Sequence, residues 1–152
     1  MSGLETYVHQ SGLERPLLEL VKLRASFMNG CAYCVDMHTK VARSLGETEQ
    51  RLYAVSLWRE CPYYSERERA ALAWTEAITL VSADHVPDEA YELVRPHFTE
   101  KELVDLTLAI VAINGWNRLA IAFRIVPGTF RLGGRQRDRA ASESPPAHAS
   151  GE

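Results

Sequence analysis

The chain has 152 residues, of which 46% are hydrophobic and 24% charged, and its formal net charge is −3. This length supports one domain with a core that needs no covalent staples, and the composition is typical of a soluble globular protein. The small charge imbalance gives no indication of a nucleic-acid partner. Three cysteines are too few for a disulfide scaffold, and the first residues lack the pattern of a signal peptide, so we expect a cytoplasmic protein.

Helical patterns fill the first half of the chain. Apolar residues repeat at helical spacing over residues 13–24, and Pro16 is compatible with the first turn of a helix. A second helix is predicted over residues 31–46, because it would end at a glycine. A third is predicted over residues 48–61, since it begins at a good N-cap threonine and stops before a proline.

Two capping boxes open helices in the second half, at residues 65–68 and 99–102. The first begins a helix with an apolar inner face. The second begins a long helix that could run to about residue 125, before a Pro-Gly pair. Between them, residues 87–95 form a short predicted helix.

Strand signals are nearly absent, so the predicted fold class is all-α: a single-domain bundle of about six or more helices over residues 1–130. Residues 131–152 are rich in Gly, Arg, Ser and Pro, and we expect them to be disordered. Polar and charged side chains interrupt the longest apolar stretch, residues 103–126. This pattern predicts a buried or half-buried helix and no membrane span.

The most informative motif is the pair Cys31 and Cys34, with His38 four residues further on. If this segment is helical, steps of about 100° place the three side chains within about 60° of arc. The first turn of a helix favours an anion, so we expect lowered thiol pKa values and a reactive thiolate here. This arrangement favours redox chemistry.

A Cys-x-x-Cys pair is also half of a zinc site, and two such thiols can simply pack in a core. A zinc site would need two more ligands. Cys61 comes 27 residues later with no second cysteine nearby, and His38 with His85 or His97 would give a spacing that matches no zinc pattern. We therefore expect no metal. Cys61, just before a proline, is interpreted as a packed or partly exposed thiol without a role.

Other polar side chains have two interpretations each. His38 lies four residues from the second thiol and could take its proton, although a lone histidine is more often only half-buried. On pattern alone, Glu19 is a solvated charge. Trp116 and Asn117 follow Gly115 in the long apolar helix. They mark either a notch for close packing or a polar lining for the thiol pocket.

Several separated blocks resemble the alkylhydroperoxidase AhpD-like core, within the wider carboxymuconolactone decarboxylase-like family. The likeness covers most of residues 13–130 and is carried by residues 19–24, 29–40, 46–52, 68–77 and 114–118. It implies an all-helical subunit that assembles into homotrimers or homohexamers. It also implies peroxide reduction, or disulfide exchange supporting it, through the paired cysteines.

By this resemblance, Cys34 is the thiolate that attacks peroxide, and Cys31 resolves its sulfenic acid as a disulfide. His38 relays a proton between Cys34 and a carboxylate. Glu19 lies twelve residues before the first cysteine, where the family has its glutamate. Tyr33 stands where the best-known members have a histidine. Because a phenol does not titrate near neutral pH, one proton carrier of the relay is missing.

The leading hypothesis is a thiol-dependent peroxidase or disulfide reductase that acts on a small peroxide or disulfide and draws electrons from an unidentified thiol reductant. It needs no cofactor, and we expect no nucleic-acid or membrane partner. The alternatives are a non-enzymatic redox sensor or adaptor, whose disulfide state controls assembly or docking, and a binding module with incidental thiols. Candidate lining residues of the thiol pocket are Tyr33, Trp116 and Asn117.

Overall fold

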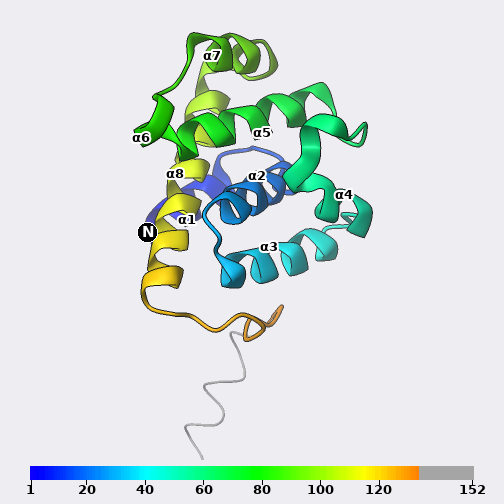
Figure 1. The fold of residues 1–152 in the computed structure, drawn as a ribbon, viewed down its shortest axis with the longest axis vertical. Helices are drawn as coiled ribbons and strands as arrows, with labels where there is room; N and C mark the ends of the chain where they lie inside the picture. Colours follow the sequence, from blue (N-terminus) through cyan, green and yellow to red (C-terminus); the bar gives the residue numbers. More distant parts are fainter. Residues whose placement is uncertain (134–152) are drawn as a thin grey trace, which may run out of the picture.

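The computed structural model describes residues 1–133, which are all-helical, as predicted, with no strand among them (Figure 1). The predicted disordered tail lies outside these residues except for its first three. The α-helices are α1 (Ser2–Gln10), α2 (Arg15–Met28), α3 (Ala32–Ser44), α4 (Glu49–Ala54), α5 (Glu66–Thr79), α6 (Val81–Asp84), α7 (Asp88–Val94) and α8 (Glu100–Ala122), and two 3-10 segments cover Val55–Glu60 and Arg95–His97.

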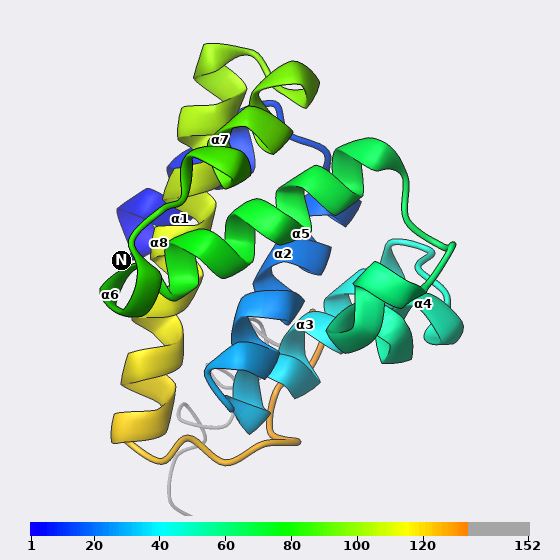
Figure 2. The same cartoon turned by 45° about the horizontal axis from the view of Figure 1, so that its top comes forward.

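Helix α2 lies at the centre of the bundle and packs against α3, α5 and α8 (Figure 2). Every residue from Leu17 to Leu23 is buried, so this helix has no solvated face over two turns. Two charged side chains, Glu19 and Lys22, are carried into the interior within this run. Such groups require partners, because an unpaired buried charge is costly.

The predicted helix starts are confirmed. Pro16 lies in the first turn of α2, and the Thr48 side chain caps α4. Both capping boxes form, at Ser65 for α5 and at Thr99 for α8. In each box the N-cap side chain and the glutamate three residues later satisfy each other's backbone N–H groups, which fixes where the helix begins.

Two predicted helix ends are wrong. The third predicted helix is divided, because the chain tightens into the 3-10 segment after Ala54. With three residues per turn, Val55 and Trp58 share one face, and both are buried. The last helix stops at Ala122, since Arg124 adopts a left-handed φ of 53° and the next N–H bonds back into the final turn.

Helix α1 was not predicted, because only Leu4 and Val8 mark its inner face. It packs along α8, and Val8 is fully buried. The Met1 side chain lies over Gly115, where an added Cβ would be 2.7 Å from the methionine Cε. Gly115 is therefore a packing notch for α1, and α8 runs through it without a break.

Helix α8 is long and apolar enough to cross a membrane by length and composition. The core helix of a soluble protein passes the same test. Here α8 packs against α1, α2, α3 and α5, and 44% of its most apolar 18-residue window is buried. The prediction of a half-buried helix is confirmed.

After α8 the chain passes beneath α3 as an irregular segment with several turns, residues 123–133, which we call the strap (Figure 1). Two hydrogen bonds hold it to α3. The N–H of Gly128 donates to Oδ2 of Asp36 at 3.1 Å, and Nζ of Lys40 donates to the carbonyl of Phe130 at 3.4 Å. The strap thereby closes one side of the space between α3 and α8.

Candidate active site

The two thiols lie at the start of α3. Cys31 is the N-cap residue, and its Sγ accepts the backbone N–H of Cys34 at 3.4 Å. Gly30, with a φ of 68°, makes the turn that brings the chain from α2 into this position. Both cysteines are free and only 1% exposed, and their sulfurs are 2.6 Å apart. A disulfide between them would need little movement.

His38 and Glu19 join α3 to α2 beside the thiols. Nδ1 of His38 lies 2.7 Å from Oε2 of Glu19, and the two side chains are 7% and 4% exposed. Glu19 is therefore not a solvated charge, contrary to its pattern. Nε2 of His38 is buried and has no partner among the described residues. This atom belongs to a side chain one helical turn beyond Cys34, where neighbouring side chains meet.

A cavity of about 420 Å³ opens between α1, α2, α3, α8 and the strap. Cys34 and His38 line it, but Cys31 does not. Tyr33 and Trp116, two of the three candidate lining residues, also line it. The volume falls in the range of sites for small organic molecules. The rest of the lining is Glu5, His9, Arg15, Glu19, Lys22, Met37, Val41, Ile113, Ala120, Ile125 and Phe130.

Asn117 is outside the cavity wall and fully buried. Its Oδ1 accepts from Nδ2 of Asn29 at 2.8 Å, and its Nδ2 donates to Oγ of Ser26 at 3.0 Å. It lies on the same face of α8 as Ile113 and Ala120, which pack against both cysteines. Asn117 therefore lies on the side of the thiols away from the cavity and helps to fix their surroundings.

The expectation of a lowered thiol pKa is wrong for Cys34. Burial, and after it the hydrogen bond with Cys31, raises the pKa of this thiol to about 12, while Asn117 acts in the opposite direction. The helix N-terminus does not offset burial, because the sulfur placed on its N–H group is that of Cys31. Cys34 consequently needs a base to become a nucleophile.

This raised pKa predicts how Cys34 reacts with a neutral alkylating agent. At pH 7 only roughly 10⁻⁵ of the thiol is ionised, so its rate of alkylation by iodoacetamide should rise about tenfold per pH unit from pH 7 to 10. Peptide mapping of native protein quenched at intervals measures this rate. A cysteine-containing peptide, with an ordinary thiol pKa near about 8.5, is the reference and should level off earlier. A plateau for Cys34 below pH 8 would contradict the burial argument.

Sequence reasoning missed the ion pair between Lys22 and Glu5 in the cavity wall. The Lys22 side chain is 2% exposed, and its Nζ contacts Oε1 of Glu5 from α1. Burial acts to raise the pKa of Glu5, but the ammonium of Lys22 outweighs it and holds the pKa below its ordinary value. The available signal was the position of Lys22, three residues after Glu19 in an otherwise apolar run.

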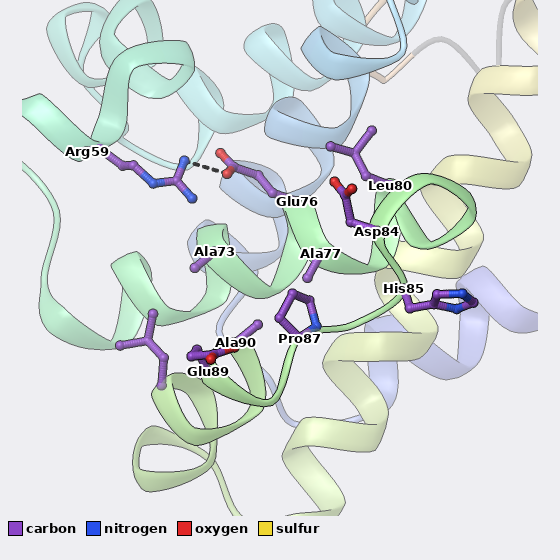
Figure 3. Close-up of a pocket in the computed structure, with 11 residues that line it drawn as sticks. Arg59, Ala73, Glu76, Ala77, Leu80, Asp84, His85, Pro87, Glu89 and Ala90 are labelled. Carbon is purple, nitrogen blue, oxygen red and sulfur yellow. Dashed lines mark ion pairs between the residues drawn. The ribbon is translucent and has the colours of Figure 1, made fainter.

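A second hollow, of about 360 Å³, lies between α5 and α7 (Figure 3). No cysteine lines it. Its wall includes Glu76, which bonds to Nη2 of Arg24 at 2.8 Å, Nη1 of Arg59 at 2.5 Å and Nε1 of Trp58 at 2.7 Å. These contacts tie α5 to α2 and to the 3-10 segment, so we assign Glu76 a structural role.

Replacing Glu76 with alanine should therefore lower the free energy of unfolding by about 2–4 kcal/mol, because a half-buried guanidinium and an indole N–H lose their shared acceptor. Urea denaturation measures this change. The rate of Cys34 oxidation in the folded variant should equal that of the unchanged protein. A loss of stability under about 0.5 kcal/mol would contradict the structural role.

The third cysteine, Cys61, is half-buried and packs at the edge of a different core cluster, with Trp58 and Tyr64. It does not line the cavity. Within residues 1–133, no group of three or more His, Cys, Asp or Glu side chains is arranged to hold a metal ion. The chemistry-bearing groups of the site are thus the thiol pair and the His38–Glu19 pair.

Comparisons with known proteins identify the family of this chain. The model of the carboxymuconolactone decarboxylase family matches residues 1–77. The uncharacterized protein YdfG of Bacillus subtilis (strain 168) is 52% identical over 122 residues, which cover 80% of this chain and 83% of that protein.

Solved structures of similar fold place the chain in the same family. A protein of unknown function from Agrobacterium tumefaciens, described as a candidate antioxidant defence protein AhpD, has a TM-score of 0.82 and 49% identity, covering 85% of this chain and 88% of that one. The alkylhydroperoxidase AhpD core of a peroxidase-related protein from Ralstonia eutropha JMP134 has a TM-score of 0.66 and 26% identity, covering 78% and 62%. The chain therefore belongs to the carboxymuconolactone decarboxylase family and, within it, to the AhpD-like proteins.

Proposed function

We propose that this protein is a thiol-dependent peroxidase that reduces organic hydroperoxides through Cys34 and Cys31. The observation that carries the proposal is the arrangement of the two free thiols. Their sulfurs are 2.6 Å apart, and only Cys34 lines the cavity. A substrate in the cavity would therefore meet Cys34 first, which supports Cys34 as the attacking thiol and Cys31 as the resolving one. The peroxidase-related structural relatives are consistent with this class of reaction.

The first step needs the proton of Cys34 to leave, because burial keeps that thiol protonated. Nε2 of His38 accepts it, and Glu19, bonded to Nδ1, stabilises the imidazolium that results. The thiolate then attacks the terminal oxygen of the hydroperoxide. The O–O bond breaks, Cys34 becomes a sulfenic acid, and the leaving alkoxide takes the proton back from His38.

In the second step the thiol of Cys31 attacks the sulfenic sulfur. A disulfide forms, and the hydroxyl leaves as water with the proton of Cys31. An external dithiol reduces this disulfide by thiol–disulfide exchange and is itself oxidised to a disulfide. Tyr33 lines the cavity, where its hydroxyl can donate a hydrogen bond. In this scheme His38 alone carries the proton.

The test is a thiol titration of the native protein before and after one equivalent of cumene hydroperoxide, with peptide mapping by mass spectrometry. The expected result is loss of two thiols within seconds, recovered as a Cys31–Cys34 disulfide, and repeated turnover when dithiothreitol is supplied. Free thiols after exposure to cumene hydroperoxide and to hydrogen peroxide would overturn the proposal. Oxidation of one equivalent without turnover, together with a change in assembly size, would instead favour a redox sensor.

A further inference from the structure

Three charged side chains of α2 face the cavity in one stripe. Arg15, Glu19 and Lys22 follow one another at spacings of four and three residues, and all three line the cavity. Glu19 is held by His38, and Lys22 by Glu5. Arg15 makes neither an ion pair nor a side-chain hydrogen bond with the described part of the chain. Arg15 is exposed, so its charge lies at the rim of the cavity without a protein partner among the described residues.

No nearby carboxylate is left to neutralise Arg15. The two carboxylates of the cavity wall, Glu5 and Glu19, are already bonded. The adjacent residue, Glu14, pairs with Arg67 instead. Arg15 also lies in the first turn of α2, where the helix dipole adds partial positive charge. This rim of the cavity thus favours a bound anion.

The remaining walls favour an apolar body. They are formed by Met37 and Val41 of α3, Ile113 and Trp116 of α8, and Ile125 and Phe130 of the strap. Beside the reactive thiol, Nε2 of His38 is buried without a partner among residues 1–133. Buried polar atoms are ordinarily hydrogen-bonded, so this atom indicates that a polar group of a bound molecule lies there.

We propose that the hydroperoxide reduced here carries a carboxylate, which Arg15 binds while the peroxide group meets Cys34 and His38. This inference rests on the proposed function and names its substrate class. Arg15 lies one helical turn before Glu19, the residue that holds His38, and both line the same cavity. Arginine suits this task because its planar fork binds a carboxylate through two hydrogen bonds. The product is the corresponding hydroxy acid.

The first test compares two hydroperoxides that differ only in charge: cumene hydroperoxide with a carboxylate at the para position, and the methyl ester of that compound. The unchanged protein should favour the acid by about tenfold in kcat/KM, mainly through KM, and added salt should reduce the preference. Arg15→Gln should remove the preference, because kcat/KM for the acid falls about tenfold to the level of the ester. Arg95→Gln, which loses an exposed arginine paired with Glu92, is the control. Equal rates with both compounds would overturn the inference.

A second measurement does not depend on peroxidase activity. Calorimetric titration with 4-isopropylbenzoate, which has no peroxide group, should show binding that weakens about tenfold in Arg15→Gln, whereas 4-isopropylbenzamide should bind both proteins equally. Binding that depends on Arg15, without oxidation of the thiols by either hydroperoxide, would keep the anion site and overturn the peroxidase. Turnover of both hydroperoxides with no preference would keep the peroxidase and overturn the anion site.

Discussion

Replacing Cys34 with serine should reduce the consumption of organic hydroperoxide by roughly a thousandfold or more, the largest effect we expect from any single substitution. The physical reason is that a serine hydroxyl does not attack the peroxide bond at neutral pH and cannot form a disulfide. Cys34 is also the one thiol of the pair that lines the cavity. A coupled assay with excess dithiothreitol measures turnover.

Two further variants, one at each of the other cysteines, test whether the loss of activity is specific to Cys34. Cys31→Ser should still react once with peroxide, but its sulfenic acid has no neighbouring thiol 2.6 Å away to resolve it, so a dimedone adduct should accumulate on Cys34. Cys61→Ser removes a half-buried thiol from a different core cluster and should retain full activity. Turnover in Cys34→Ser close to that of the unchanged protein would place the chemistry elsewhere.

Much of this site could be predicted from residues that lie close together in the sequence. The relation of Cys34 to His38 depends on the geometry of one helix, and the structure has that helix. Cys31 precedes it as the N-cap residue, so the predicted shared face holds only for Cys34 and His38. Glu19 is different, because its bond to His38 depends on how α2 crosses α3. Its pattern indicated a solvated charge, and only the family resemblance pointed to the site.

Other features depend on tertiary packing that no local pattern reveals. The buried ammonium of Lys22 pairs with Glu5, which belongs to α1, a helix with too few apolar residues to be predicted. The strap adds Ile125 and Phe130 to the cavity from a segment that follows the last helix. The pKa of Cys34 also depends on tertiary packing. A helix N-terminus lowers a thiol pKa, but the core built around this thiol by α8 has the larger and opposite effect.

The raised pKa of Cys34 also determines what Glu19 should do. Glu19→Gln keeps an oxygen that can accept from Nδ1 of His38 but removes the negative charge that stabilises an imidazolium. We expect oxidation of Cys34 at pH 7 to slow by roughly 10- to 100-fold, with little change in the urea midpoint. Stopped-flow measurement of the first turnover gives this rate, and Glu49→Gln, at an exposed carboxylate paired with Arg43, is the matched control.

The pH profile separates proton relay from mere packing. As pH rises toward about 12, hydroxide ionises a growing fraction of Cys34 directly, so the base matters less. The peroxide reaction of Glu19→Gln should therefore speed up by about tenfold per pH unit between pH 7 and 10. The peroxide reaction of the unchanged protein, which His38 already assists, should rise less steeply, so the two rates converge. If the two rates stayed in constant ratio across this range, Glu19 would only hold the fold around the thiol. Convergence would mean that burial keeps Cys34 unreactive at neutral pH until the His38–Glu19 pair takes its proton.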